Sequence, residues 1–256
     1  MTAYEFFDKI TGGAMPQKPR TVKEKQYEPV AIAEMLDEGA KLPDRIWGHY
    51  AFYSEPLKNK VGLPEKEQFI VRANECGVDY ANRILEENPD LTVEAIAEKL
   101  GIVVKRPSSS DGGAQGNRIL FSQFVSPNEI SIFVECLKKA ELVIDKNSLQ
   151  SFFDGIVLGD ILLAHEIFHF LEHQEKKSIF TKTQKIDLWS FKLIPNRSGL
   201  VCLGEIAAMA FTKRLLSLAW SPYILDIFLV YLYNENASYG LYNRLMRLKN
   251  SLPPTS

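Results

Sequence analysis

Hydrophobic residues recur at helical spacing along most of the chain from residue 64 onward. Over residues 64–88, one helical face carries Phe69, Ala73, Cys76, Tyr80 and Ile84. Similar patterns predict helices over residues 29–39, 93–100, 136–145, 154–175 and 201–218, and two more on either side of residues 234–237. The chain is therefore expected to be largely helical.

Three short runs have the composition of strands instead. They are "IVVKRP" (102–107), "NRILFSQF" (117–124) and "EISIFVE" (129–135). The segment around "KIDLWSFKLIP" (185–195) is mixed and favours no single element. Together the patterns predict an α+β fold, in which a small β-sheet packs against a helical bundle.

The first 60 residues are less regular than the rest. Residues 15–26 have the composition of a polar linker, and residues 42–56 are rich in aromatic residues with prolines at their borders. The second segment is expected to be an irregular arm on the main body, or alternatively a surface for a partner. The sequence thus predicts an N-terminal extension over 1–60 and a main domain with extra C-terminal helices over 61–256.

Bulk composition excludes several classes of protein. The 256 residues carry a formal net charge of −2, so no overall positive field attracts nucleic acid or an anionic membrane. Asp8 and Lys9 interrupt the apolar core that a signal peptide needs, and the apolar run 223–233 is too short to span a bilayer. The three cysteines form no CxxC pair. A cytoplasmic location is expected.

One segment imitates a DNA-binding motif. Residues 92–104, "TVEAIAEKLGIVV", resemble the first helix and turn of a helix-turn-helix unit. A DNA-reading unit needs a second amphipathic helix directly after the glycine turn, whereas this chain continues with an extended segment broken by Pro107. No direct contact with nucleic acid is expected.

The strongest chemical signal is the HExxH pattern formed by His165, Glu166 and His169. Positions four residues apart on a helix differ by only about 40° around the axis and about 6 Å along it, so two imidazoles can reach one Zn²⁺. Glu166 then flanks the metal without having to bind it. Apolar residues surround this helix on most sides, which predicts that it is buried and that its polar groups need partners.

Two histidines require a third protein ligand, with the fourth position open to water. The candidates are His49, Glu172, His173, Glu175 and Glu205. His173 lies one turn too far along a straight helix. Glu205 is favoured because Ala207 and Ala208 allow its helix to pack closely across the HExxH helix; the alternative is that Glu205 faces solvent.

The segments "AHEIFHFLEH" (164–173) and "EIAAMAFTKRLL" (205–216) resemble the two active-site helices of the ImmA/IrrE-type zinc metallopeptidases. The resemblance covers roughly residues 65–220. It implies zinc as the cofactor, His165, His169 and Glu205 as its ligands, and Glu166 as the catalytic acid/base. It also implies a protein substrate, such as a helix-turn-helix transcriptional repressor. Phe168 and Glu172 depart from the family pattern, which usually has glycine and leucine there.

Several roles stay open at the level of sequence. The residues considered as donors to an oxyanion are His49, Arg197, Tyr239 and Tyr242. Trp189 and Phe191 are considered as the lining of a substrate groove, and His173 as a gating residue. Two alternatives to a peptidase are a non-catalytic zinc-stabilised module for protein interaction and a metal-free interaction protein.

Overall fold

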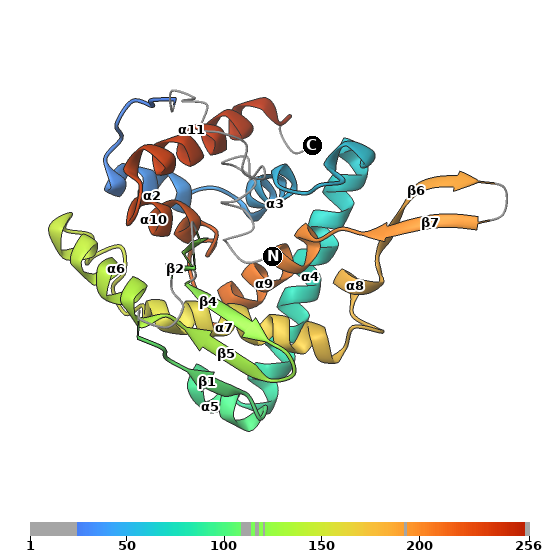
Figure 1. Cartoon of the computed structure of the whole chain (residues 1–256), viewed down its shortest axis with the longest axis horizontal. Helices are drawn as coiled ribbons and strands as arrows, with labels where there is room; N and C mark the ends of the chain where they lie inside the picture. The colour runs from blue at the N-terminus through green and yellow to red at the C-terminus, as the bar shows by residue number, and fades with distance from the viewer. Residues whose placement is uncertain (1–24, 109–113, 116–117, 120, 192–193, 254–256) are drawn as a thin grey trace.

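The computed structural model describes residues 25–253, except for 109–113, 116–117, 120 and 192–193 (Figure 1). Its helices are α2 (Ile32–Ala40), α3 (Asp44–Tyr53), α4 (Leu63–Glu87), α5 (Val93–Lys99), α6 (Val134–Lys146), α7 (Leu158–Gln174), α8 (Phe180–Thr183), α9 (Cys202–Leu215), α10 (Ile224–Tyr231) and α11 (Glu235–Ser251), with a 3₁₀ turn at Lys58–Lys60. Its strands are β1 (Val103–Lys105), β2 (Ala114–Gln115), β3 (Arg118–Ile119), β4 (Ser122–Val125), β5 (Glu129–Ile132), β6 (Lys185–Phe191) and β7 (Ile194–Gly199). The expected α+β fold is confirmed.

The helices α4, α7 and α9 form the centre of the molecule. Helix α9 packs against both α4 and α7, and the small sheet lies over α7 (Figure 1). At the crossing of α4 and α9, a Cβ atom on Gly77 would lie 2.1 Å from the Ala207 carbonyl oxygen. Only glycine allows the two backbones to approach this closely, so Gly77 sets the distance between the helices.

The sheet has the order β1-β5-β4, with β1 parallel and β4 antiparallel to β5. Strand β4 therefore lies at an edge, next to α7. Thr92 caps α5 by accepting a hydrogen bond from the Ala95 amide, and β1 follows where a second DNA-reading helix would have to begin. The extended segment expected after the glycine turn is confirmed.

The irregular arm expected over residues 42–56 is wrong, because most of it forms helix α3. Pro43 takes the extended conformation that suits a residue before a helix, and Trp47, Tyr50 and Phe52 are buried. Trp47 stacks on Tyr223, with the ring centroids 5.9 Å apart. These three aromatic residues belong to the core, whereas Tyr53 in the same segment is exposed, so a partner surface over residues 42–56 stays a prediction.

Other differences concern the ends of elements. Helix α7 begins at Leu158 rather than near 154, after a turn in which Gly155 has a φ of +69°. Helix α6 begins at Val134, so residues 134–135 belong to a helix and not to the preceding strand. The mixed segment 185–195 forms most of the β6–β7 hairpin, which projects from the body (Figure 1).

No helix in the part of the chain that the structure describes is long and apolar enough to cross a bilayer. The early polar segment, residues 15–26, lies almost entirely outside the described residues, as do the first 24 residues in general. Helices α2 and α3 share one hydrophobic cluster with the helices of the main body.

Candidate metal centre

Helix α7 brings two imidazoles to one point. His165 and His169 are successive members of one helical stripe, and their Nε2 atoms lie 3.0 Å apart. Glu205, from the first turn of α9, joins them: one carboxylate oxygen lies 3.5 Å from His165 Nε2 and the other 3.5 Å from His169 Nε2. The three residues form a His/His/Glu group that could hold a metal ion.

The distances within this group are short enough for a shared cation. Zinc ligands at about 2.0–2.1 Å in a tetrahedron are separated from one another by about 3.3 Å. The two imidazole nitrogens lie 3.0 Å apart, each lies 3.5 Å from a different oxygen of Glu205, and one ligand atom from each residue lies within 4.8 Å of the other two. Two histidine nitrogens and one carboxylate are also a common donor set for catalytic zinc, so the chemistry of the group fits the metal.

Helix packing places Glu205. The close approach of α4 at Gly77 fixes the position of α9, and the amide of Cys202 donates a hydrogen bond of 3.0 Å to the Glu55 carboxylate at the beginning of α9. Glu55 is 1% exposed and also accepts a hydrogen bond from the Leu57 amide. A residue of the first 60 thus anchors the helix that carries the candidate metal ligand.

Glu166 points toward the sheet. One carboxylate oxygen accepts a hydrogen bond of 2.7 Å from Ser122 Oγ, and the other accepts one of 2.8 Å from the Phe124 amide. The side chain is 2% exposed. These two donors from β4 fix the orientation of the carboxylate, and each oxygen keeps a further lone pair.

Glu172 lies on the outer side of His169. Its carboxylate is 3.5 Å from His169 Nδ1, and it accepts a hydrogen bond of 2.6 Å from Thr181 Oγ1. Lys182 Nζ is 2.8 Å away. Burial by itself would raise the pKa of Glu172, but the hydrogen bond from His169 and the charge of Lys182 lower it to about 2.

The electrostatics of the two histidines differ. Burial is the main cause that lowers the pKa of His165, which favours the neutral imidazole that binds metals. Burial also acts to lower the pKa of His169, but the negative charges of Glu205 and Glu172 outweigh it and raise that pKa. The negative charge of Glu205, which faces His169 Nε2, would also favour a metal cation at that nitrogen.

The other candidates for a third ligand have partners elsewhere. His173 Nε2 is 3.1 Å from Ser126 Oγ on the β4–β5 turn, so this histidine belongs to the contact between α7 and the sheet. Glu175 accepts a hydrogen bond from the Tyr80 hydroxyl. His49 Nε2 is 2.9 Å from a Glu67 oxygen. None of these three belongs to the group formed by His165, His169 and Glu205.

The residues considered as oxyanion donors are also engaged away from this group. Arg197 pairs with Asp187 across the β6–β7 hairpin at 2.7 Å, and the Tyr239 hydroxyl donates to Glu235 at 3.2 Å. Burial, together with the negative charges of Glu34 and Glu38 on α2, raises the pKa of Tyr242. The side chains of Trp189 and Phe191 lie outside the described residues, so their expected place in a substrate groove stays a prediction.

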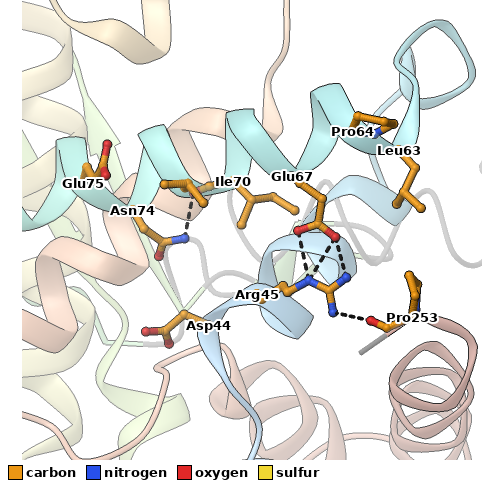
Figure 2. Close-up of a pocket in the computed structure, with 10 residues that line it drawn as sticks. Asp44, Arg45, Leu63, Pro64, Glu67, Ile70, Asn74, Glu75 and Pro253 are labelled. Atoms are coloured by element: carbon orange, nitrogen blue, oxygen red, sulfur yellow. Dashed lines mark hydrogen bonds and ion pairs between the residues drawn. The ribbon is translucent and has the colours of Figure 1, made fainter. Parts of the chain in front are cut away.

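A separate surface pocket of about 710 Å³ lies between α3, α4 and the end of the chain (Figure 2). Arg45 donates to Glu67 through two nitrogens and to the Pro253 carbonyl oxygen at 3.1 Å. These charged groups therefore satisfy one another. The His/His/Glu group does not line this pocket among the residues described.

Sequence reasoning missed three contributors around the histidines. Ser122 and the Phe124 amide come from a strand some 40 residues before Glu166, and no local pattern connects them. Glu172 had a usable signal, because it lies three residues after His169 and therefore on a neighbouring face of the same helix. Glu172 was considered as a metal ligand, whereas its carboxylate contacts His169 Nδ1, the nitrogen that points away from the His/His/Glu group.

The chain matches no protein-family model, no curated protein sequence and no solved structure.

Proposed function

We propose that this chain is a cytoplasmic zinc-dependent metallopeptidase that hydrolyses a peptide bond in a protein substrate. The observation that carries the proposal is the convergence of His165, His169 and Glu205 on one point, beside the Glu166 of an HExxH helix. The resemblance of the two helices to the ImmA/IrrE-type metallopeptidases adds support, and it alone suggests a helix-turn-helix transcriptional repressor as the substrate.

In this proposal, His165, His169 and Glu205 would hold the zinc ion. When bound, zinc supplies Lewis acidity that lowers the pKa of water and polarises a carbonyl group. Glu166 is the residue that accepts a proton on its carboxylate and returns it to the leaving amine. Its two hydrogen bonds to β4 hold the carboxylate in one orientation while this proton moves.

The hydrogen bonds of Glu166 also favour a second candidate function. A non-catalytic zinc-stabilised interaction module has no need of a base, but Glu166 joins α7 to β4 and could be retained for that purpose alone. In that case the HExxH helix would serve only to bind the metal and to anchor the sheet.

Two measurements test the proposal. Elemental mass spectrometry on protein purified without a metal-affinity column should find about one zinc per wild-type chain and none in His169→Ala or Glu205→Ala. A library of peptides from a digested bacterial proteome, incubated with the zinc-loaded protein, should yield new termini with wild type and none with Glu166→Gln. Zinc without cleavage would favour the interaction module, and wild type that binds no zinc would contradict both functions.

A further inference from the structure

Glu172 occupies a particular place relative to His169. Its carboxylate faces His169 Nδ1 at 3.5 Å, whereas the Nε2 atom of the same ring faces His165 at 3.0 Å. A histidine that binds a cation through Nε2 keeps its proton on Nδ1, so Glu172 is the acceptor for that proton. Glu172 thus contacts the outer nitrogen of His169 and not the position that the cation would occupy.

The position of Glu172 is itself fixed by α8. Thr181 Oγ1 donates to one carboxylate oxygen at 2.6 Å, and Lys182 Nζ lies 2.8 Å from the other. The side chain of Glu172 is only 5% exposed. A buried carboxylate with partners on both oxygens has little freedom to turn away from the imidazole.

The neighbouring helix leaves room for this carboxylate. A Cβ atom on Gly204 would lie 2.7 Å from one Glu172 oxygen and 3.3 Å from the other. The position next to Glu205 on α9 therefore lacks a side chain where Glu172 needs space. Helices α7, α8 and α9 all contribute to one arrangement around His169.

The second histidine has no such support. His165 Nδ1 is buried and makes no hydrogen bond within the part of the chain that the structure describes. Only one of the two imidazoles has a carboxylate on its outer nitrogen, so the two rings are not held equally.

We propose that Glu172 is a positioning residue: by accepting the Nδ1 proton of His169 it orients the ring for metal binding through Nε2, and Thr181 holds the Glu172 carboxylate in place. The inference rests on the proposed zinc function. Carboxylates that accept a hydrogen bond from a metal-bound histidine fix its tautomer and make the ring a better donor, and their loss lowers metal affinity by about 10- to 100-fold.

The experiment measures the zinc dissociation constant of the full chain by competition with a chromophoric chelator. Glu172→Gln should weaken zinc binding by about 10- to 100-fold. Glu175→Gln, the same substitution three residues further on, should leave it within about twofold, because Glu175 contacts Tyr80 instead. The visible absorption spectrum of the Co²⁺-loaded protein should change in Glu172→Gln and not in Glu175→Gln.

Two further variants test whether Glu172 acts by orienting the His169 ring or only by attaching α8 to α7. Lys182→Met removes the ion pair but leaves Glu172 facing His169, so zinc affinity should change by less than about threefold. Thr181→Val releases one carboxylate oxygen and should weaken binding several-fold; it also serves as the deciding variant if Glu172→Gln does not fold. Equal losses in Lys182→Met and Glu172→Gln would overturn the inference.

The outcomes are distinguishable from those for the proposed function. Tight zinc binding by wild type and equally tight binding by Glu172→Gln and Thr181→Val would overturn the role of Glu172 alone. A wild-type chain that binds no zinc would overturn the metal centre, and the positioning role with it.

Discussion

The Glu166 carboxylate and the Phe124 amide are joined by a hydrogen bond of 2.8 Å, which connects the HExxH helix to the edge strand of the sheet. Ser122, two residues earlier on the same strand, donates to the second carboxylate oxygen. The residue that the sequence marks as a base is thus also the link between two parts of the fold, and its two roles can be tested separately.

Ser122→Ala tests the structural role. The substitution leaves one buried Glu166 oxygen without its donor, which should lower the free energy of unfolding by about 1–3 kcal/mol in urea denaturation. Ser126→Ala on the same hairpin, whose hydroxyl is exposed to solvent, should cost less than about 0.5 kcal/mol. Equal stability of both variants would mean that the bond to Ser122 contributes nothing to the fold.

Stabilisation by zinc tests the metal centre independently of activity. A ligand that binds only the folded state raises the free energy of unfolding by about 2.7 kcal/mol at 100 times its dissociation constant. Zinc should therefore raise the melting temperature of wild type and of His173→Ala, because His173 contacts Ser126 and not the metal group. His169→Ala should show no such shift in differential scanning calorimetry, and a shift as large as that of wild type would contradict the assignment.

Glu55→Ala should weaken the beginning of α9. The variant leaves the buried Cys202 amide and the half-buried Leu57 amide without their acceptor, at a cost of about 2 kcal/mol in the free energy of unfolding. Because Glu205 lies in the first turn of α9, zinc affinity should also fall. Glu38→Ala, which removes a carboxylate at the surface that pairs with Lys41, is the control and should change neither quantity measurably.

Gly77→Ala should be strongly destabilising. The new Cβ atom would lie 2.1 Å from the Ala207 carbonyl oxygen, so α4 and α9 would have to separate at a cost of about 3 kcal/mol or more. Gly159→Ala is the control, because its Cβ atom would meet Leu137 at an ordinary 3.6 Å, and alanine is the better helix former by about 1 kcal/mol. Thermal unfolding of both variants measures the difference, and a neutral Gly77→Ala would contradict the close crossing.

The raised pKa of Asp226 predicts that the stability of the protein depends on pH. Burial, with the negative charge of Glu205, raises the pKa of Asp226 from its ordinary 3.8 to about 7. A carboxyl group with a raised pKa in the folded state contributes stability that is complete below pH 3.8 and is lost as the pH rises through about 7. Between pH 5 and pH 8 the metal-free protein should lose about 2–3 kcal/mol of unfolding free energy through this group.

The measurement for Asp226 is urea denaturation in the presence of EDTA across that range. Asp226→Asn should flatten the dependence, whereas Asp187→Asn, on the exposed hairpin, should leave it as in wild type. A dependence unchanged by Asp226→Asn would show that the buried carboxyl group does not titrate over this interval.

Much of the fold follows from local pattern. The stripe from Phe69 to Ile84 predicted α4, the pattern over residues 93–100 predicted α5, and the apolar surroundings of the HExxH segment predicted that α7 is buried; all three are confirmed. The prediction of an irregular arm over residues 42–56 was wrong. The apolar residues of this segment do not form a single stripe, so its sequence shows no clear helical pattern. Trp47 and Tyr50 are buried because α3 packs against α4, α9 and α11 and both rings contact Tyr223.

The sequence by itself determined the spacing of His165, Glu166 and His169, because the pitch of a helix is the same wherever the helix lies. The sequence favoured Glu205 among the candidates for a third residue, but only the tertiary structure shows that Glu205 lies beside both histidines. The position of Glu205 depends on how α9 packs against α4 and α7. Gly77 and Glu55, which are remote from Glu205 in the sequence, fix that packing. The tertiary structure also decided the contacts of Glu172 with Thr181 and of Ser122 with Glu166. Contacts between residues distant in sequence come from packing and leave no periodic pattern.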